Sequence, residues 1–179
     1  MEEWWWYLSR STGIVATALA VGSLYLGFFF SARNTGVRRP AAWWLDLHNY
    51  LGGLALAFTG AHILASLLDP QSGVGLVQAL VPGTADSATW AMSWGVLATY
   101  TFVIAVFTSW PKRRFSRRTW RVLHLASVAG VALAGIHGLE LGSDATTRLF
   151  EVGLLVGAAL SVYALALRVI AATTRRFSR

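Results

Sequence analysis

The chain has 179 residues, of which 55% are hydrophobic and only 13% charged, and its mean hydropathy is +0.53. Because water-soluble domains carry about 25% charged residues, this composition excludes an ordinary soluble domain. The absence of cysteine excludes disulfides, thiolate metal sites and iron–sulfur clusters. The net charge of +7 does not indicate nucleic-acid binding, because the basic residues lie in short connections between apolar runs.

Five apolar runs are long enough to cross the ~30 Å hydrocarbon core of a bilayer. They cover about residues 5–30, 43–68, 89–110, 119–141 and 147–172, and tryptophans lie at several of their ends, as in interfacial belts. The first run lacks the flanks of a signal peptide, so we expect a retained helix. In the loop 69–88, the apolar stretch 74–81 is too short to span and predicts an interfacial helical turn. Residues 1–179 are therefore predicted to form one all-α integral membrane domain, a five-span helical bundle.

The distribution of basic residues predicts the orientation of this bundle. All but two of the 15 Lys and Arg residues, Arg10 and Arg148, fall on one side of the predicted membrane. Since Lys and Arg are enriched in cytoplasmic connections, we expect the N-terminus outside and the C-terminus in the cytoplasm. The predicted location is the cytoplasmic (inner) membrane of a bacterium.

All four histidines of the chain lie in two of the runs. His48 and His62 are fourteen residues apart in the second run, and His124 and His137 are thirteen apart in the fourth. Both runs cross the membrane in the same direction, so His48 and His124 share one depth and the other two share another, about 20 Å away. Two imidazoles are the axial ligands of a six-coordinate haem, which predicts two b-type haems. A proton or metal-ion pathway and purely structural histidines are the alternatives.

Small residues beside the histidines suit a porphyrin held between helices, although close helix packing explains some of them. They are Gly52, Gly53, Gly60, Ala61, Gly135 and Gly138. The spacing in the fourth run is less regular, because thirteen residues leave two side chains about 140° apart on a straight helix. We expect this helix to be distorted by a π-bulge or kink at Gly130 or Gly135, or to present its histidines from opposite flanks.

Two segments carry a family resemblance, LHNYLGGLALAFTGAHIL and WRVLHLASVAGVALAGIHGLELGSDA. With the opening Ser9–Gly13, they resemble the ferric reductase-like transmembrane domain, the membrane haem core of NADPH oxidases, of ferric reductases and of the periplasmic methionine sulfoxide reductase system. The resemblance covers nearly the whole chain. It implies a bis-histidine, two-haem cytochrome that passes single electrons across the membrane. By position, His48 and His124 would hold the inner haem, and His62 and His137 the outer one.

The chain departs from the larger members of that family. It has no GxGxxG fingerprint after a plausible strand, and no flavin or nicotinamide domain follows the fifth run, so we expect that it cannot oxidise NADPH alone. We expect an oxidoreductase component that takes electrons from a cytoplasmic flavoprotein or quinone and delivers them to an outer-side protein or small oxidant. One alternative is a terminal reductase of ferric iron or oxygen at the outer haem. Another is a non-redox proton channel or membrane anchor.

Charged residues near the ends of the runs have more than one interpretation. Arg10 either reaches the lipid headgroups or pairs with a propionate of the outer haem, and the resemblance favours the haem. The basic stretch Lys112–Arg121 is expected to bind anionic lipid; docking of an acidic flavin-bearing donor, or contacts from Arg117, Arg118 or Arg121 to inner-haem propionates, are alternatives. Asp46 is expected to pair with one of these arginines or to take up a proton. Four acids on the outer side are expected to be ordinary loop residues or to attract a cationic acceptor: Asp69, Asp86, Glu140 and Asp144.

Overall fold

The computed structural model of the protein describes residues 3–32, 40–109 and 115–177. In these ranges the chain is all α-helical and contains no strand. Five long helices are apolar enough to cross a membrane: α1 (Glu3–Ala32), α2 (Ala41–Leu68), α4 (Thr89–Ser109), α5 (Arg117–Leu141) and α6 (Arg148–Phe177). They confirm the predicted five spans to within a few residues. Trp110, at the predicted end of the third span, lies outside the described residues.

Local sequence explains where several helices begin and end. Pro40 occupies the N-cap of α2 in an extended conformation. Proline is tolerated at the start of a helix because the first N–H groups have no partner within the helix. Ser116 caps α5, because its hydroxyl accepts a hydrogen bond of 3.1 Å from the backbone N–H of Thr119. The predicted turn in the second loop is confirmed as the short helix α3 (Leu76–Leu80). The hydroxyl of Tyr100, on α4, donates to the carbonyl of Leu80 and ties α3 to the bundle.

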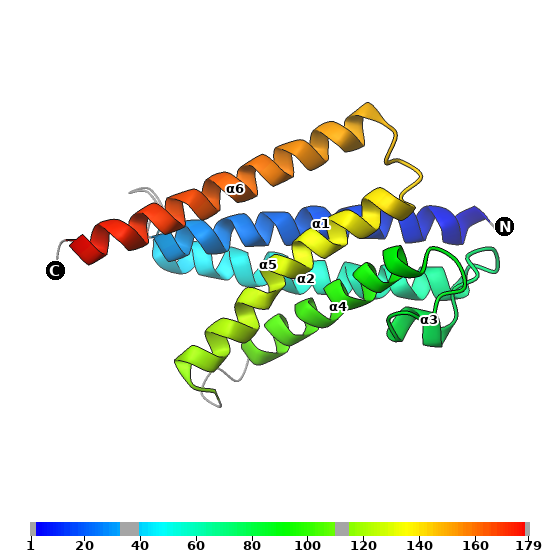
Figure 1. Ribbon diagram of the computed structural model, residues 1–179, viewed down its shortest axis with the longest axis horizontal. Helices are drawn as coiled ribbons and strands as arrows, with labels where there is room; N and C mark the ends of the chain where they lie inside the picture. Colours follow the sequence, from blue (N-terminus) through cyan, green and yellow to red (C-terminus); the bar gives the residue numbers. More distant parts are fainter. Residues whose placement is uncertain (1–2, 33–39, 110–114, 178–179) are drawn as a thin grey trace.

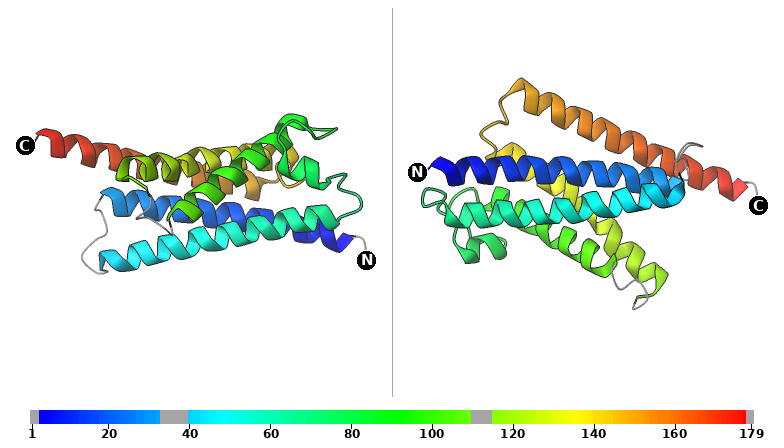
Figure 2. Two further views of the ribbon diagram at one scale, coloured as in Figure 1. Left: turned by 90° about the horizontal axis from the view of Figure 1, so that it is seen from below. Right: turned by 180° about the vertical axis from the view of Figure 1, so that it is seen from behind.

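Four of the five long helices form two pairs. Helix α1 packs along α2, α4 packs along α5, and α6 packs on α1 (Figure 1). The two further views show that α5 crosses α1 and α2 obliquely, whereas α1 and α2 stay side by side over most of their length (Figure 2). The chain begins at one end of the bundle and finishes at the other. Which end faces the cytoplasm stays a prediction.

The core of the bundle is built largely from alanine. Buried alanines occur on every long helix except α5: Ala16, Ala20, Ala32, Ala55, Ala65, Ala91, Ala98, Ala105 and Ala164. Small side chains let helix backbones approach closely, while large apolar side chains face outwards, as on α6. This distribution is typical of a membrane protein, because lipid and not water surrounds the outer face.

Helix α5 differs from its prediction. It is an uninterrupted α-helix over Arg117–Leu141, so the π-bulge expected at Gly130 or Gly135 is not present. Instead, Gly130 is buried at the crossing with α4, where an added Cβ would overlap the hydroxyl of Thr101 and lie 3.1 Å from Phe102. Because the crossing lies between His124 and His137, each histidine extends from α5 on its own side of it. Whether α5 is kinked or presents its histidines from opposite flanks stays a prediction.

Candidate functional site: two pairs of facing histidines

The fold brings the four histidines together in two pairs. His48 of α2 faces His124 of α5 with ring centroids 5.8 Å apart and planes at 70°, and we call these two the C-end pair. His62 faces His137 with centroids 6.1 Å apart and planes at 81°, and these are the N-end pair. All four side chains are half-buried. The predicted pairing of histidines across two helices is therefore present in the structure.

Helix α1 holds both histidines of α2 by their Nδ1 atoms. The Nδ1 of His62 lies 2.7 Å from the carbonyl oxygen of Ser9, and the Nδ1 of His48 lies 2.8 Å from that of Ser23. Each serine hydroxyl adds a second contact, at 3.2 Å and 3.0 Å respectively. The hydroxyl of Ser9 also bonds that of Ser66, which donates to the carbonyl of His62. The imidazole rings of His48 and His62 are thus oriented by α1.

Helix α4 has the same role for the histidines of α5. The Nδ1 of His137 lies 2.8 Å from the carbonyl oxygen of Ala91. The Nδ1 of His124 lies 3.2 Å from the hydroxyl of Ser109, which itself donates to the carbonyl of Ala105 at 2.7 Å. The indole of Trp120 stacks on His124 with centroids 5.0 Å apart and planes at 18°.

These contacts select one tautomer for the histidines. A carbonyl oxygen only accepts, so the Nδ1 of His48, His62 and His137 must carry the proton. At His124, the hydroxyl of Ser109 uses its proton on Ala105 and is therefore an acceptor for Nδ1–H. In this tautomer Nε2 is unprotonated and is the nitrogen suited to bind a metal.

Glycines on the orienting helices make room for the rings. A Cβ added at Gly13 would lie 3.0 Å from the Nδ1 of His62, and one at Gly95 would lie 2.8 Å from the Nδ1 of His137. At Gly27 it would lie 3.1 Å from a ring carbon of His48. The rings of His48, His62 and His137 therefore each lie against a glycine, where a larger side chain would crowd the ring. The small residues predicted from sequence are different ones, and added Cβ atoms at Gly53 and Gly60 would meet open space.

The orienting positions form a repeat that the histidine pattern does not predict. Ser9 and Gly13 recur fourteen residues later as Ser23 and Gly27 on α1, with the same spacing as the two histidines of α2. On α4 the corresponding pairs are Ala91 with Gly95, and Ala105 with Ser109. The sequence signal was a small residue followed four residues later by another, at the spacing of the ligands. Such pairs are common in membrane helices, so the signal is weak without the fold.

The geometry of the pairs suits a metal bound between two imidazoles. With metal–nitrogen bonds of about 2 Å, two collinear imidazoles have ring centroids about 6 Å apart. Among the described residues, no group of three or more His, Cys, Asp or Glu side chains converges on one point. A bare zinc-type ion is held by about three or four protein ligands. The pairs fit better a metal whose remaining positions are filled by a macrocycle, as in haem.

Arg10 lies at the N-terminal end of the bundle and pairs with a residue of the chain itself. Its guanidinium forms an ion pair with Asp144, in the loop between α5 and α6, and lies over the ring of Trp6 with its carbon 4.7 Å from the centroid. The predicted choice between headgroup and propionate contact is not decided by this pair. Asp144 is one of the four outer acids, and of the others Asp69 is buried while Asp86 and Glu140 are exposed.

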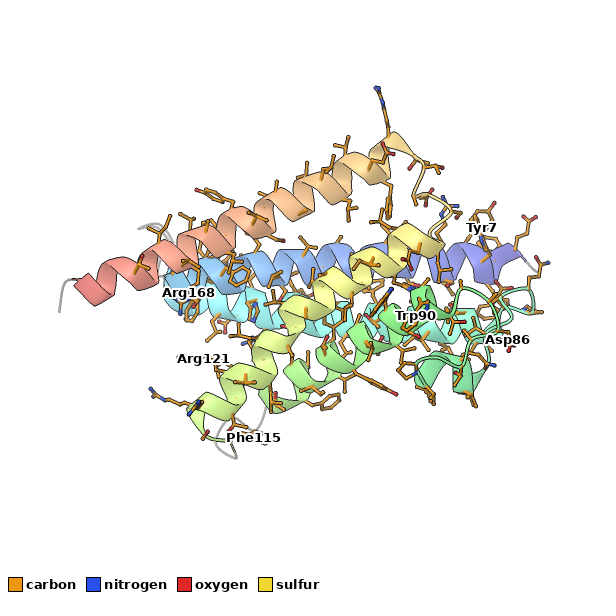
Figure 3. The ribbon with its side chains drawn as sticks, viewed as in Figure 1. Tyr7, Asp86, Trp90, Phe115, Arg121 and Arg168 are labelled. Carbon is orange, nitrogen blue, oxygen red and sulfur yellow. The ribbon has the colours of Figure 1, made fainter. Side chains whose placement is uncertain are left out.

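The two ends of the bundle differ in their surface residues. Asp86, Tyr7 and Trp90 lie toward the end where the chain begins, and Phe115, Arg121 and Arg168 toward the other (Figure 3). Asp46, Arg117, Arg118 and Arg121 are exposed. Several basic residues of the predicted clusters lie outside the described residues: Arg33, Arg38, Arg39, Lys112, Arg113, Arg114 and Arg179.

Comparison with known families agrees with this geometry. Residues 3–135 match the ferric reductase like transmembrane component family. The chain belongs to this family. The match includes α1, α2 and α4 and three of the four histidines, and it ends two residues before His137. No curated protein and no solved structure matches the chain. A role in transmembrane electron transfer follows from the family, as the sequence resemblance implied.

Proposed function

We propose that this protein is a di-haem b-type cytochrome that passes single electrons across the cytoplasmic membrane of a bacterium. His48 and His124 would bind one haem, and His62 and His137 the other. The observation that carries the proposal is the pair of facing imidazoles at each end of the bundle, with the Nδ1 atoms of His48, His62 and His137 held by main-chain carbonyl oxygens. Family membership supports it independently.

A bound haem supplies reversible one-electron chemistry at its iron. The chain supplies geometry and electrostatics. Helices α1 and α4 fix the tautomer and direction of each ligand, which raises ligand basicity and lowers the flexibility of the site. The fourteen residues between His48 and His62 set the two sites about 21 Å apart along α2.

One further group near the C-end pair supports a bound cofactor. Trp44 lies one helical turn before His48, and its indole N–H is buried without an acceptor in the described part of the chain. Buried donors are nearly always paired. An acceptor on a bound group, such as a propionate oxygen, would satisfy this N–H.

The direction of transfer rests on the distribution of charge. The C-end pair lies at the end that carries Arg121 and Arg168, and the positive-inside tendency assigns that end to the cytoplasm. Electrons would then enter at the C-end haem from a flavoprotein or quinone. They would leave at the N-end haem for a protein or small oxidant on the outer side, with Arg10 near that exit. Membrane lipid would surround the outer faces of the helices.

The test is to count haems in the purified protein. We expect two haems per chain by the pyridine haemochromogen assay, a dithionite-sensitive α-band, and low-spin signals typical of bis-imidazole iron. His62→Ala and His137→Ala should each remove half of the pigment and leave the other site intact. A colourless preparation, or full pigment in both variants, would contradict the proposal and leave a non-redox role. Rapid oxidation of the reduced protein by ferric chelate alone would favour the terminal-reductase alternative.

A further inference from the structure

The two histidines of α2 are oriented by serines of α1 whose hydroxyls donate to different partners. At the C-end pair, the hydroxyl of Ser23 donates to the carbonyl oxygen of His48 at 3.0 Å. At the N-end pair, the hydroxyl of Ser9 lies 2.7 Å from that of Ser66, which donates to the carbonyl oxygen of His62 at 2.9 Å. We propose that Ser66 is a positioning residue for His62, which fixes the Ser9 hydroxyl as an acceptor for Nδ1–H and thereby lowers the midpoint potential of the N-end haem. This inference rests on the proposed haem at that pair.

Ser66 stands at a position where the two halves of α2 differ. It follows His62 by four residues, as Gly52 follows His48, and the two positions are fourteen residues apart, like the histidines themselves. A Cβ at Gly52 would lie 3.3 Å from the hydroxyl oxygen of Ser23. A side chain at this register position therefore faces the orienting serine of α1. Because Gly52 has no side chain, the hydroxyl of Ser23 reaches the main chain directly.

The hydrogen bonds of the N-end pair assign a place to each proton. The Nδ1 of His62 lies 2.7 Å from the carbonyl oxygen of Ser9, so this nitrogen carries a proton. The single proton of the Ser66 hydroxyl goes to the carbonyl of His62, so its oxygen accepts from the hydroxyl of Ser9. The Ser9 oxygen in turn accepts from Nδ1–H at 3.2 Å. A chain of hydrogen bonds thus runs from the ring of His62 through two hydroxyls to the main chain of the same residue.

The two linked hydroxyls have a consequence for the metal that His62 would bind. Hydrogen bonds in a chain strengthen one another, because a hydroxyl that donates becomes a better acceptor. The Ser9 oxygen is therefore a stronger acceptor for Nδ1–H when Ser66 is present. An imidazole whose Nδ1–H is held more strongly is a stronger donor to its metal. A stronger donor stabilises ferric iron more than ferrous iron, so Ser66 would lower the midpoint potential of the N-end haem.

The test changes Ser66 and the matched position Gly52, and follows both haems by redox titration of the α-band. We expect Ser66→Ala to raise the midpoint potential of the N-end haem and to weaken its retention about 10-fold, as for other lost outer partners of metal ligands. The C-end haem should be unchanged, and Ser66→Thr, which keeps the hydroxyl, should keep the parent potential. Gly52→Ser adds a hydroxyl beside Ser23, so it should lower the potential of the C-end haem below that of Gly52→Ala, which adds only the Cβ. His62→Ala, which lacks the N-end haem, identifies the potential that belongs to the C-end haem.

The variants at Gly52 keep the inference testable if Ser66→Ala folds poorly, because they change the other end of α2. An unchanged or lowered N-end potential in Ser66→Ala would overturn the inference, as would equal shifts in Ser66→Ala and Ser66→Thr. A C-end potential in Gly52→Ser that is not below that of Gly52→Ala would overturn it too. A merely structural tie between α1 and α2 would not move the two potentials in opposite directions. A parent protein without haem would instead refute the proposed function, so the two failures are distinct.

Discussion

The two helix pairs each hold two histidines, but their helices pack with different geometry. In each pair one helix carries two histidines and the other orients them. Helices α1 and α2 run side by side, so ligands and orienting residues share one fourteen-residue spacing. Helices α4 and α5 cross at Gly130, and the ligands of α5 are thirteen residues apart. A close crossing therefore allows a helix to present two ligands whose spacing does not return to one face.

The largest effect is expected from variants that remove one histidine from each of the two histidine pairs. Each haem needs one imidazole from each helix pair, so one substitution at each depth should remove both haems. We expect His62→Ala with His124→Ala to abolish the pigment. His62→Ala with His137→Ala should lose only half, because both changes fall on the N-end pair. Haem content and the α-band measure the result, with immunoblotting of the membrane fraction to normalise for the amount of protein.

The reverse pattern would show that the pairing is wrong. If His62→Ala with His137→Ala lost all pigment while His62→Ala with His124→Ala kept half, the ligands would pair diagonally. That outcome conflicts with the centroid distances of 5.8 Å and 6.1 Å within the pairs. The experiment thus tests the relation between the two halves of the bundle directly.

Next in size are changes at the glycines that cradle the rings. Gly95→Ala should weaken retention of the N-end haem about 10-fold, because the new Cβ would lie 2.8 Å from the Nδ1 of His137 and displace the ring. Gly13→Ala, with 3.0 Å to His62, should have a smaller effect. Gly153→Ala on α6 is the matched control, since its Cβ would meet open space and α6 neither carries nor orients a histidine. The rate of haem transfer to apomyoglobin measures haem retention. Equal rates in all three variants would show that Gly13 and Gly95 do not determine the positions of the rings.

The sequence predicts much of this molecule and not the rest, for a physical reason. Hydropathy locates the five spans and the turn at α3, because bilayer thickness sets helix length. Histidine is rare inside a membrane. Four histidines at matched depths on two spans therefore predict two facing pairs. The orienting residues are serine, alanine and glycine, which occur throughout the chain. Main-chain carbonyls such as that of Ala91 have no sequence signal at all, since every residue has one.

The course of α5 was predicted only in part for a related reason. The thirteen-residue spacing shows that a regular, side-by-side helix does not suffice. It does not say whether the helix itself or its angle to the neighbours changes. The close packing of α5 on α4 leaves no room for a Cβ at Gly130 beside Thr101 and Phe102, two residues that hydropathy treats as ordinary members of α4.

A smaller effect, on stability more than on haem, is expected at this crossing. Gly130→Ala would force its Cβ against Thr101 and Phe102, and overpacking of this kind costs about 1–3 kcal/mol. Gly153→Ala on α6, whose Cβ would meet open space, should be neutral or slightly stabilising because alanine favours helix. Thermal unfolding in detergent compares the two. Adding Thr101→Ala to Gly130→Ala should recover part of the loss; no recovery would mean that the crossing is not limited by this contact.

The smallest effect concerns the ion pair that joins the halves at the N-terminal end of the bundle. The side chains of Arg10 and Asp144 are 29% and 20% exposed, so solvent weakens their attraction, and we expect Asp144→Asn to lower the free energy of unfolding by no more than about 1 kcal/mol. A double-mutant cycle with Arg10→Gln measures this coupling. If Arg10 also pairs with a haem propionate, Arg10→Gln should lower the potential of the N-end haem, because it removes a positive charge beside the propionate. Asp144→Asn should not lower this potential, because it removes no positive charge. Equal and opposite shifts of that potential in the two variants would mean that each charge acts on the haem from a distance, and that Asp144 is the partner of Arg10 in the loaded protein as well.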